Sequence, residues 1–131
     1  MLQQVLFICI GNACRSQMAE GFARVYGGDV MTPASAGVWP AMMVPLETHE
    51  TMAEKNIDTR DQFPKPLDMF RSNQFDVVLN MSGYPVPAYP EAREWKVEDP
   101  IGGTAEEYRA TRDYIEVLVM NLIVELRRQN K

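Results

Sequence analysis

The sequence has few of the residues that staple secreted proteins or bind structural metals. It contains two cysteines, Cys9 and Cys14, and one histidine. Two thiols five positions apart cannot join distant segments of a chain, and a single histidine supplies no cluster of zinc ligands. We therefore expect a cytoplasmic protein with reduced thiols and without a metal site.

Long apolar runs and an excess of positive charge are also missing. No stretch approaches the roughly 18 consecutive apolar residues of a membrane span, and the first residues lack the basic start of a signal peptide. The formal net charge is -5 and the pI is about 4.9, whereas nucleic acids and anionic membranes attract basic proteins. We predict a soluble protein that binds neither a nucleic acid nor a membrane, so any anion site must be local.

The chain does contain enough apolar material for one compact domain. Its 131 residues are 46% apolar, which suffices for a core without disulfides or metal. No internal repeat or low-complexity linker divides it. We predict a single domain over residues 1–131 and expect a monomer.

Strands and helices are predicted to alternate along the chain. Residues 2–10 form a continuous apolar run, typical of a strand buried on both faces, and the helical spacing of Met18, Phe22 and Val25 follows until Gly27. Further strands are expected at 29–36, 75–80 and 95–97, and further helices at 46–56 and from Thr104, which begins a capping-box pattern. This order predicts an α/β fold with a parallel sheet that is flanked by helices on both faces.

The segment between the first strand and the first helix reads Cys9-Ile10-Gly11-Asn12-Ala13-Cys14-Arg15-Ser16. A helix that follows the carboxyl end of a parallel strand exposes unpaired N–H groups there, and a loop of small residues can turn successive N–H groups inward around an anion. Arg15 adds a planar guanidinium that can bind two oxygens. We predict that the backbone from Ile10 to Ser16 binds a tetrahedral oxyanion above Cys9.

Cys9 is the candidate nucleophile. An isolated cysteine at the end of an apolar strand is more often an inert buried side chain. Here it coincides with a glycine-containing turn, Arg15 and a helix N-terminus, and a cation and a helix N-terminus both favour the thiolate. Ser16 could add a hydrogen bond to the sulfur. The sequence has no Gly-Lys-Ser/Thr nucleotide loop that would compete as an anion site.

This segment resembles the signature of low-molecular-weight protein tyrosine phosphatases and of the arsenate reductases that share their fold. The similarity extends to residues 17–21, 35–37, 57–58 and 99–100. The resemblance implies a four-stranded parallel sheet, Cys9 as the nucleophile, Arg15 as the oxyanion clamp and Ser16 as the thiolate stabiliser. It also implies that Asp99 is the general acid, and that Asn12 and Ser35 brace the loop.

The main functional hypothesis is a phosphatase that hydrolyses phosphotyrosine or aryl phosphates, on a protein or a small molecule. Cys9 would attack phosphorus in line, and Asp99 would protonate the leaving oxygen and then activate the water that hydrolyses phosphocysteine. These steps require no metal or organic cofactor. Family phosphatases carry aromatic residues after the Asp-Pro pair, however, and Ile101-Gly102-Gly103 stands there instead.

The alternative is an arsenate reductase. Thioredoxin-coupled reductases of this fold use two further cysteines in the loop after the third strand, and residues 81–94 contain none. The sequence is compatible with a single-cysteine reductase that uses an external thiol or a glutaredoxin-like partner. A non-catalytic phosphate-binding module is the second alternative. Cys14 is either a small side chain of the loop or a reversible disulfide partner of Cys9.

Overall fold

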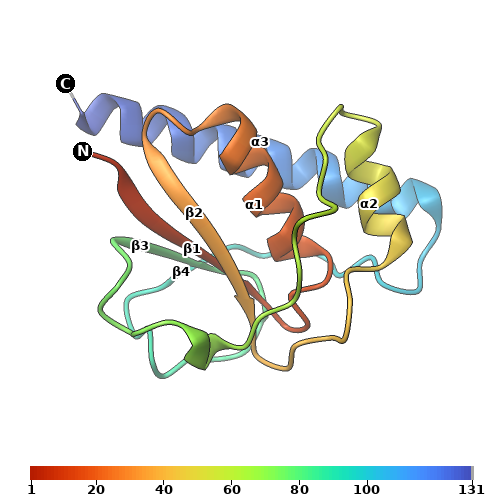
Figure 1. Cartoon of the computed structure of the whole chain (residues 1–131), viewed down its shortest axis with the longest axis horizontal. Coiled ribbons are helices and arrows are strands. Elements are labelled where there is room, and N and C mark those ends of the chain that lie inside the picture. The colour runs from red at the N-terminus through yellow and green to blue at the C-terminus, as the bar shows by residue number, and fades with distance from the viewer. Residues whose placement is uncertain (131) are drawn as a thin grey trace.

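The computed structural model describes residues 1–130 (Figure 1). One sheet contains four parallel strands in the order β2-β1-β3-β4: β1 (Gln3–Cys9), β2 (Met31–Gly37), β3 (Val77–Asn80) and β4 (Arg93–Glu94). The described residues also form three α-helices and one 3-10 turn: α1 (Arg15–Tyr26), α2 (Leu46–Ala53), α3 (Ala105–Gln129) and η1 (Leu67–Met69). The predicted α/β fold with a four-stranded parallel sheet is confirmed.

Strand β1 lies inside the sheet and is covered on both faces. Val5 and Phe7 point toward α1 and α3, whereas Leu6 and Ile8 point to the opposite face, as the alternation of a strand requires. All four side chains are fully buried, which explains why β1 reads as a continuous apolar run.

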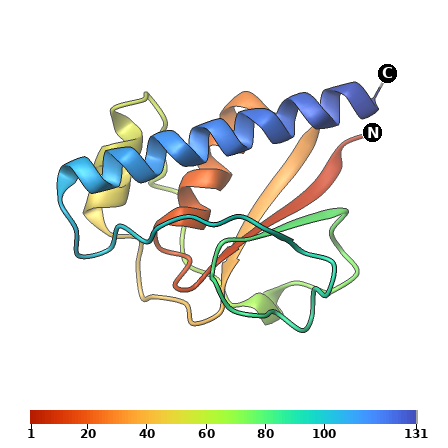
Figure 2. The same cartoon turned by 180° about the vertical axis from the view of Figure 1, so that it is seen from behind.

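The α-helices gather on one face of the sheet (Figures 1 and 2). Phe22 of α1, Met52 of α2 and Val119 of α3 share one core cluster there. The opposite face is covered by η1 and by loop residues such as Val86 and Tyr89. Helices were predicted on both faces, but within the described residues the second face carries only the 3-10 turn η1. The Pro-rich connection before β4 packs there in place of a helix.

Two local predictions differ from the structure. Val25 is 53% exposed, because α1 packs on the sheet through Met18 and Phe22. The last strand is Arg93–Glu94 and not 95–97, and Trp95 ends the pairing by donating its backbone N–H to Asn80 O at 3.0 Å. The Trp95 ring packs on the helix-bearing face, 5.9 Å from the ring of Phe7.

The start of α3 matches the predicted capping box. Thr104 Oγ1 accepts from the backbone N–H of Glu107 at 3.1 Å, and Glu107 Oε1 accepts from Thr104 N–H at 2.9 Å. Across residues 1–130, no helix has the length and apolar character that crossing a bilayer requires.

Candidate active site

The anion loop, residues 9–16, connects the carboxyl end of β1 to the N-terminus of α1. Cys9 is the last residue of β1 and is 2% exposed. Its Sγ lies 2.8 Å from Ser16 Oγ, which in turn accepts a hydrogen bond from Asn12 Nδ2 at 2.7 Å. The structure thus places Ser16 against the sulfur, where its hydroxyl can donate to a thiolate.

Asn12 gives the anion loop its turn. Its φ is 49°, in the left-handed region that Asn tolerates better than most residues. Its side-chain Oδ1 accepts from Lys65 N–H at 2.9 Å, and its carbonyl accepts from Gln17 Nε2 at 2.9 Å. The bracing role suggested for Asn12 therefore has a structural basis.

Strand β2 supports the loop through close backbone approach at Gly37. A Cβ atom there would lie 2.8 Å from the backbone nitrogen of Asn12 and from the carbonyl oxygen of Ile10. Ser35, which the resemblance assigned to the loop, donates instead to Glu20 Oε1 at 2.5 Å. Ser35 thus contacts α1 and supports the loop only indirectly.

Arg15 is buried, and its guanidinium joins three segments of the chain. Nη1 donates to the carbonyl oxygens of Met81 at 2.6 Å and Val97 at 3.1 Å, while Nη2 lies 3.5 Å from Asp99 Oδ2. The Asp99 side chain is 39% exposed, and its Oδ1 accepts from Ile101 N–H at 3.1 Å. The fold therefore brings Asp99 beside Arg15 across 84 positions of sequence.

Cys14 lies buried within the loop, and both cysteines are unbonded in this structure. Burial raises the pKa of the Cys14 thiol to about 12, despite a hydrogen bond with Thr48 that lowers it. A thiol with this pKa stays protonated at neutral pH. Because the thiolate is the reactive form, Cys14 is a poor nucleophile in this conformation.

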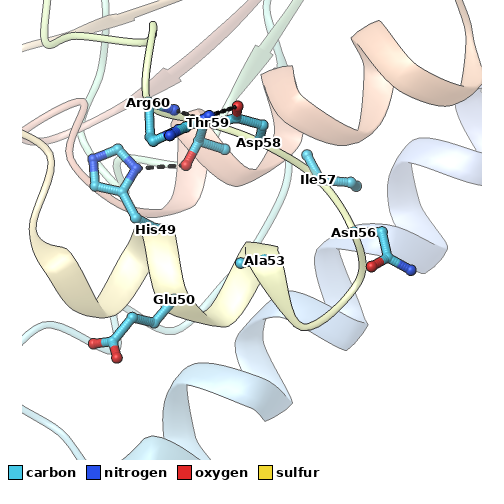
Figure 3. Close-up of a pocket in the computed structure, with 8 residues that line it drawn as sticks. All are labelled: His49, Glu50, Ala53, Asn56, Ile57, Asp58, Thr59 and Arg60. Atoms are coloured by element: carbon cyan, nitrogen blue, oxygen red, sulfur yellow. Dashed lines mark hydrogen bonds and ion pairs between the residues drawn. The ribbon is translucent and has the colours of Figure 1, made fainter.

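Two of the hollows that the described residues form differ in chemistry. One, of about 470 Å³, lies between α2 and residues 56–60 (Figure 3). His49 Nδ1 is 2.6 Å from Thr59 Oγ1 there, and Asp58 pairs with Arg60. The other, of about 420 Å³, is bordered by Arg15 and Asp99. Because the second hollow adjoins this guanidinium and this carboxyl, it is the candidate substrate cleft, and the buried Cys9 does not line it.

Residues 62–66 form a segment, here called the strap, that lies against the anion loop. Nothing in the sequence indicated this contact. Gln62 Nε2 donates to the carbonyl oxygen of Gln17 at 3.0 Å and to its Oε1 at 2.7 Å. Gln17 Nε2 also donates to Phe63 O at 3.0 Å, and Lys65 O accepts from Gly37 N–H at 2.8 Å. Most of these bonds use backbone atoms, which every residue type provides, so only the polar side chains of Gln17 and Gln62 could have given a signal in the sequence.

The geometry agrees with comparisons to known proteins. The sequence profile of the family "Low molecular weight phosphotyrosine protein phosphatase" matches residues 4–131. The chain belongs to this family and is an enzyme of the phosphatase and arsenate reductase group. The resemblance noted in the sequence is thereby confirmed.

Similar curated proteins are named as arsenate reductases. The chain is 34% identical to a glutaredoxin arsenate reductase of Synechocystis sp., and the similarity covers 95% of this chain and 99% of the relative. It is 36% identical to an arsenate reductase of Halalkalibacterium halodurans, over 85% of this chain and 88% of the relative. These names do not support phosphotyrosine hydrolysis as the main activity.

Similar solved structures include both activities. An arsenate reductase in the phosphate binding state has a TM-score of 0.88 and 33% identity, covering 95% of this chain and 99% of that chain. An arginine phosphatase from Geobacillus stearothermophilus has a TM-score of 0.85 and 27% identity, covering 97% of this chain and 94% of that chain. The fold alone therefore does not separate reduction from hydrolysis.

Proposed function

We propose that this protein reduces arsenate to arsenite, with Cys9 as the nucleophile and an external thiol as the reductant. The observation that carries the proposal is the similarity of nearly the whole chain to a glutaredoxin arsenate reductase, at 34% identity. This reverses the order of the two hypotheses drawn from the sequence. The site is compatible with the change, because Ile101-Gly102-Gly103 supplies no aromatic wall after Asp99-Pro100 and a small inorganic anion needs none.

The anion loop and Arg15 would bind arsenate. Nη1 of Arg15 is held by two carbonyl oxygens, whereas the single contact of Nη2 within residues 1–130 is with Asp99 Oδ2, at 3.5 Å. Nη2 is therefore the arm that can turn toward an oxyanion, while Nη1 keeps the guanidinium in place. The loop N–H groups at the start of α1 would share the remaining charge of the anion.

In the first step, the sulfur of Cys9 attacks arsenic and an As–S bond forms. One arsenate oxygen leaves as water, which carries away the thiol proton and one proton of the anion. Ser16 Oγ, 2.8 Å from the sulfur, stabilises the thiolate before attack. Asp99, whose carboxylate lies 3.5 Å from Arg15, would take up the proton that the thiol loses and pass it to the leaving oxygen.

In the second step, an external thiolate attacks the Cys9 sulfur, so that an S–S bond forms and the S–As bond breaks. The electron pair of that bond goes to arsenic, which leaves as arsenite, and a second external thiol then releases Cys9 as a thiol and forms the second product, a disulfide. Each arsenate thus consumes two thiols and yields one water. An external reductant is proposed because Cys14 is the only other cysteine and its raised pKa disfavours the thiolate.

Phosphate monoester hydrolysis is the second candidate. It needs only a nucleophile, an oxyanion clamp and an acid, and Asp99 lies next to Arg15 with its Oδ1 fixed by Ile101 N–H. The similarity to a solved arginine phosphatase supports the same possibility. A slow phosphatase activity beside arsenate reduction would fit this site.

The test is a paired assay on the reduced protein, Cys9→Ser and Asp99→Asn. Arsenite formation is measured with glutathione and glutaredoxin supplied, and hydrolysis is measured with p-nitrophenyl phosphate. We expect arsenite formation that Cys9→Ser abolishes, together with feeble hydrolysis. Fast hydrolysis lost in Cys9→Ser, without any arsenite, would refute arsenate reduction and establish the phosphatase.

A further inference from the structure

A buried lysine lies beside the anion loop, and the reaction described above does not use it. Lys65 belongs to the strap and is 8% exposed. Its Nζ donates to Phe63 O at 2.7 Å and lies 4.7 Å from the centre of the Phe63 ring. Burial lowers the pKa of this ammonium, and the nearby Glu20 carboxylate opposes that change. A buried charge is costly unless it is paired, so the groups that contact the Lys65 ammonium indicate what it does in the fold.

Glu20 of α1 is the acidic partner of Lys65. Its Oε1 lies 3.9 Å from Lys65 Nζ and accepts from the fully buried Ser35 hydroxyl, while its Oε2 lies 3.7 Å from Arg24 Nη1. Arg24 is on the same helix as Glu20 and its side chain is 43% exposed. Lys65 is thus the cation that links Glu20 to a second segment, the strap.

A continuous series of hydrogen bonds leads from Lys65 to the nucleophile. Its backbone N–H donates to Asn12 Oδ1 at 2.9 Å, Asn12 Nδ2 donates to Ser16 Oγ at 2.7 Å, and Ser16 Oγ lies 2.8 Å from Cys9 Sγ. If the strap moved away, Asn12 would lose the hydrogen bond to its Oδ1 first. The Ser16 hydroxyl, which Asn12 holds beside the Cys9 sulfur, would be released next.

The strap and the loop also meet at one carbonyl group. Phe63 O accepts from Lys65 Nζ and from Gln17 Nε2, and Gln17 Nε2 binds Asn12 O as well. The Lys65 ammonium therefore polarises the Phe63 carbonyl, which also binds the Gln17 side chain that holds the anion loop at Asn12 O. Without it, the Glu20 carboxylate would keep Arg24 and the Ser35 hydroxyl as partners but would lose its contact with the strap.

We propose that Lys65 is a positioning residue whose ammonium fastens the strap to α1 through Glu20 and holds Phe63 O, within the strap, where Gln17 Nε2 binds it, and that it thereby fixes Asn12, Ser16 and the Cys9 sulfur. Lys65 contacts no reacting atom. The inference shares with the proposed function only the assumption that Cys9 is the nucleophile, and it holds for arsenate and phosphate alike.

The test removes the ammonium and then supplies it again. In Lys65→Ala, the alkylation rate of Cys9 by iodoacetamide is followed by peptide mass spectrometry, and turnover is measured with arsenate and p-nitrophenyl phosphate. We expect turnover to fall about 10- to 100-fold, as misplaced catalytic groups do, with altered Cys9 alkylation. Methylammonium should restore both in part, because it can enter the space left by the side chain, whereas tetramethylammonium is too large.

Lys55→Ala is the matched control, since Lys55 also pairs with a carboxylate, Glu116, at 3.1 Å but lies outside the strap. It should behave as the parent protein does. If Lys65→Ala does not fold, as judged by circular dichroism, Lys65→Met keeps much of the side-chain volume and should show the same loss without rescue.

Two results would overturn the inference. One is parental turnover and Cys9 alkylation in the folded Lys65 variant, and the other is a loss that methylammonium does not reverse in Lys65→Ala, which would make Lys65 a packing residue only. Absence of arsenite formation by the parent protein, with the effect on Cys9 alkylation intact, would instead refute the proposed function and leave this inference standing.

Discussion

A single methyl group added at Gly37 should disturb the anion loop from the side of β2. The Cβ of an alanine would lie 2.8 Å from Asn12 N, 2.8 Å from Ile10 O and 2.9 Å from the carbonyl carbon of Gly11. Favourable contacts between carbon atoms are about 3.5–4.0 Å, so the new atom is well inside the repulsive range of three backbone atoms. Backbone cannot rotate away as a side chain can, so either the loop or β2 must shift.

The magnitude follows from that overlap. Adding a methyl group to a well-packed site costs about 1–3 kcal/mol, and we expect Gly37→Ala to lower the free energy of unfolding by an amount in this range. Displacement of the loop also moves the N–H groups around the anion, and a 1 Å misplacement can cost about 100-fold in rate. At room temperature this loss of stability would leave most of the protein folded. We therefore expect turnover to fall by more than the small unfolded fraction could explain.

The assay is urea unfolding together with turnover, and Gly28→Ala is the control. A Cβ at Gly28 would lie 3.5 Å from Arg24 O, an ordinary contact, so this variant should match or slightly exceed the stability of the parent protein. If Gly37→Ala unfolds at the same urea concentration as Gly28→Ala and keeps full turnover, the close approach of β2 to the loop does not have the role described.

Three further predictions concern acid–base behaviour. Asp99→Asn should slow the hydrolysis of phosphate esters with poor leaving groups about 10²- to 10⁴-fold, measured as rate against leaving-group pKa, and an equally active variant would exclude Asp99 as the acid. Because burial raises the pKa of the Cys14 thiol to about 12, iodoacetamide at pH 8 should leave Cys14 unmodified until urea exposes it, as peptide mapping would show. Arg109 and Arg112 lower the pKa of Glu54 to about 2 in the folded protein. The ionised Glu54 therefore stabilises the fold at any pH above the ordinary pKa of a glutamate, and this stabilisation is lost as the pH falls toward 2. Glu54→Gln should accordingly melt below the parent protein at pH 7, and the difference should vanish near pH 2.

The sequence predicted the parts of the fold whose signals are local. Strand β1 is an unbroken apolar run because both of its faces are covered, and the capping box at Thr104 marks the start of α3. The short strand β4 was misplaced because its two residues, Arg93 and Glu94, are exposed and polar. Their pairing depends on the register with β3, which no local pattern records.

The site divides in the same way. Cys9, Arg15 and Ser16 lie in one contiguous segment, so their chemistry could be inferred together from spacing. Asp99 came only from the family resemblance, since its place beside Arg15 depends on the whole fold. Lys65 gave no signal, because its link to Asn12 is made by a backbone N–H from 53 positions away.

The central claim is that Cys9 reduces arsenate with electrons from an external thiol, and a single-turnover experiment tests it most directly. Reduced protein is mixed with arsenate and one equivalent of glutathione, arsenite is counted, and the modified residue is mapped by mass spectrometry. We predict one arsenite per chain and glutathione in disulfide linkage to Cys9, which glutaredoxin with further glutathione then releases. Absence of arsenite, or arsenite accompanied by a disulfide between Cys9 and Cys14 with no bound glutathione, would contradict the claim.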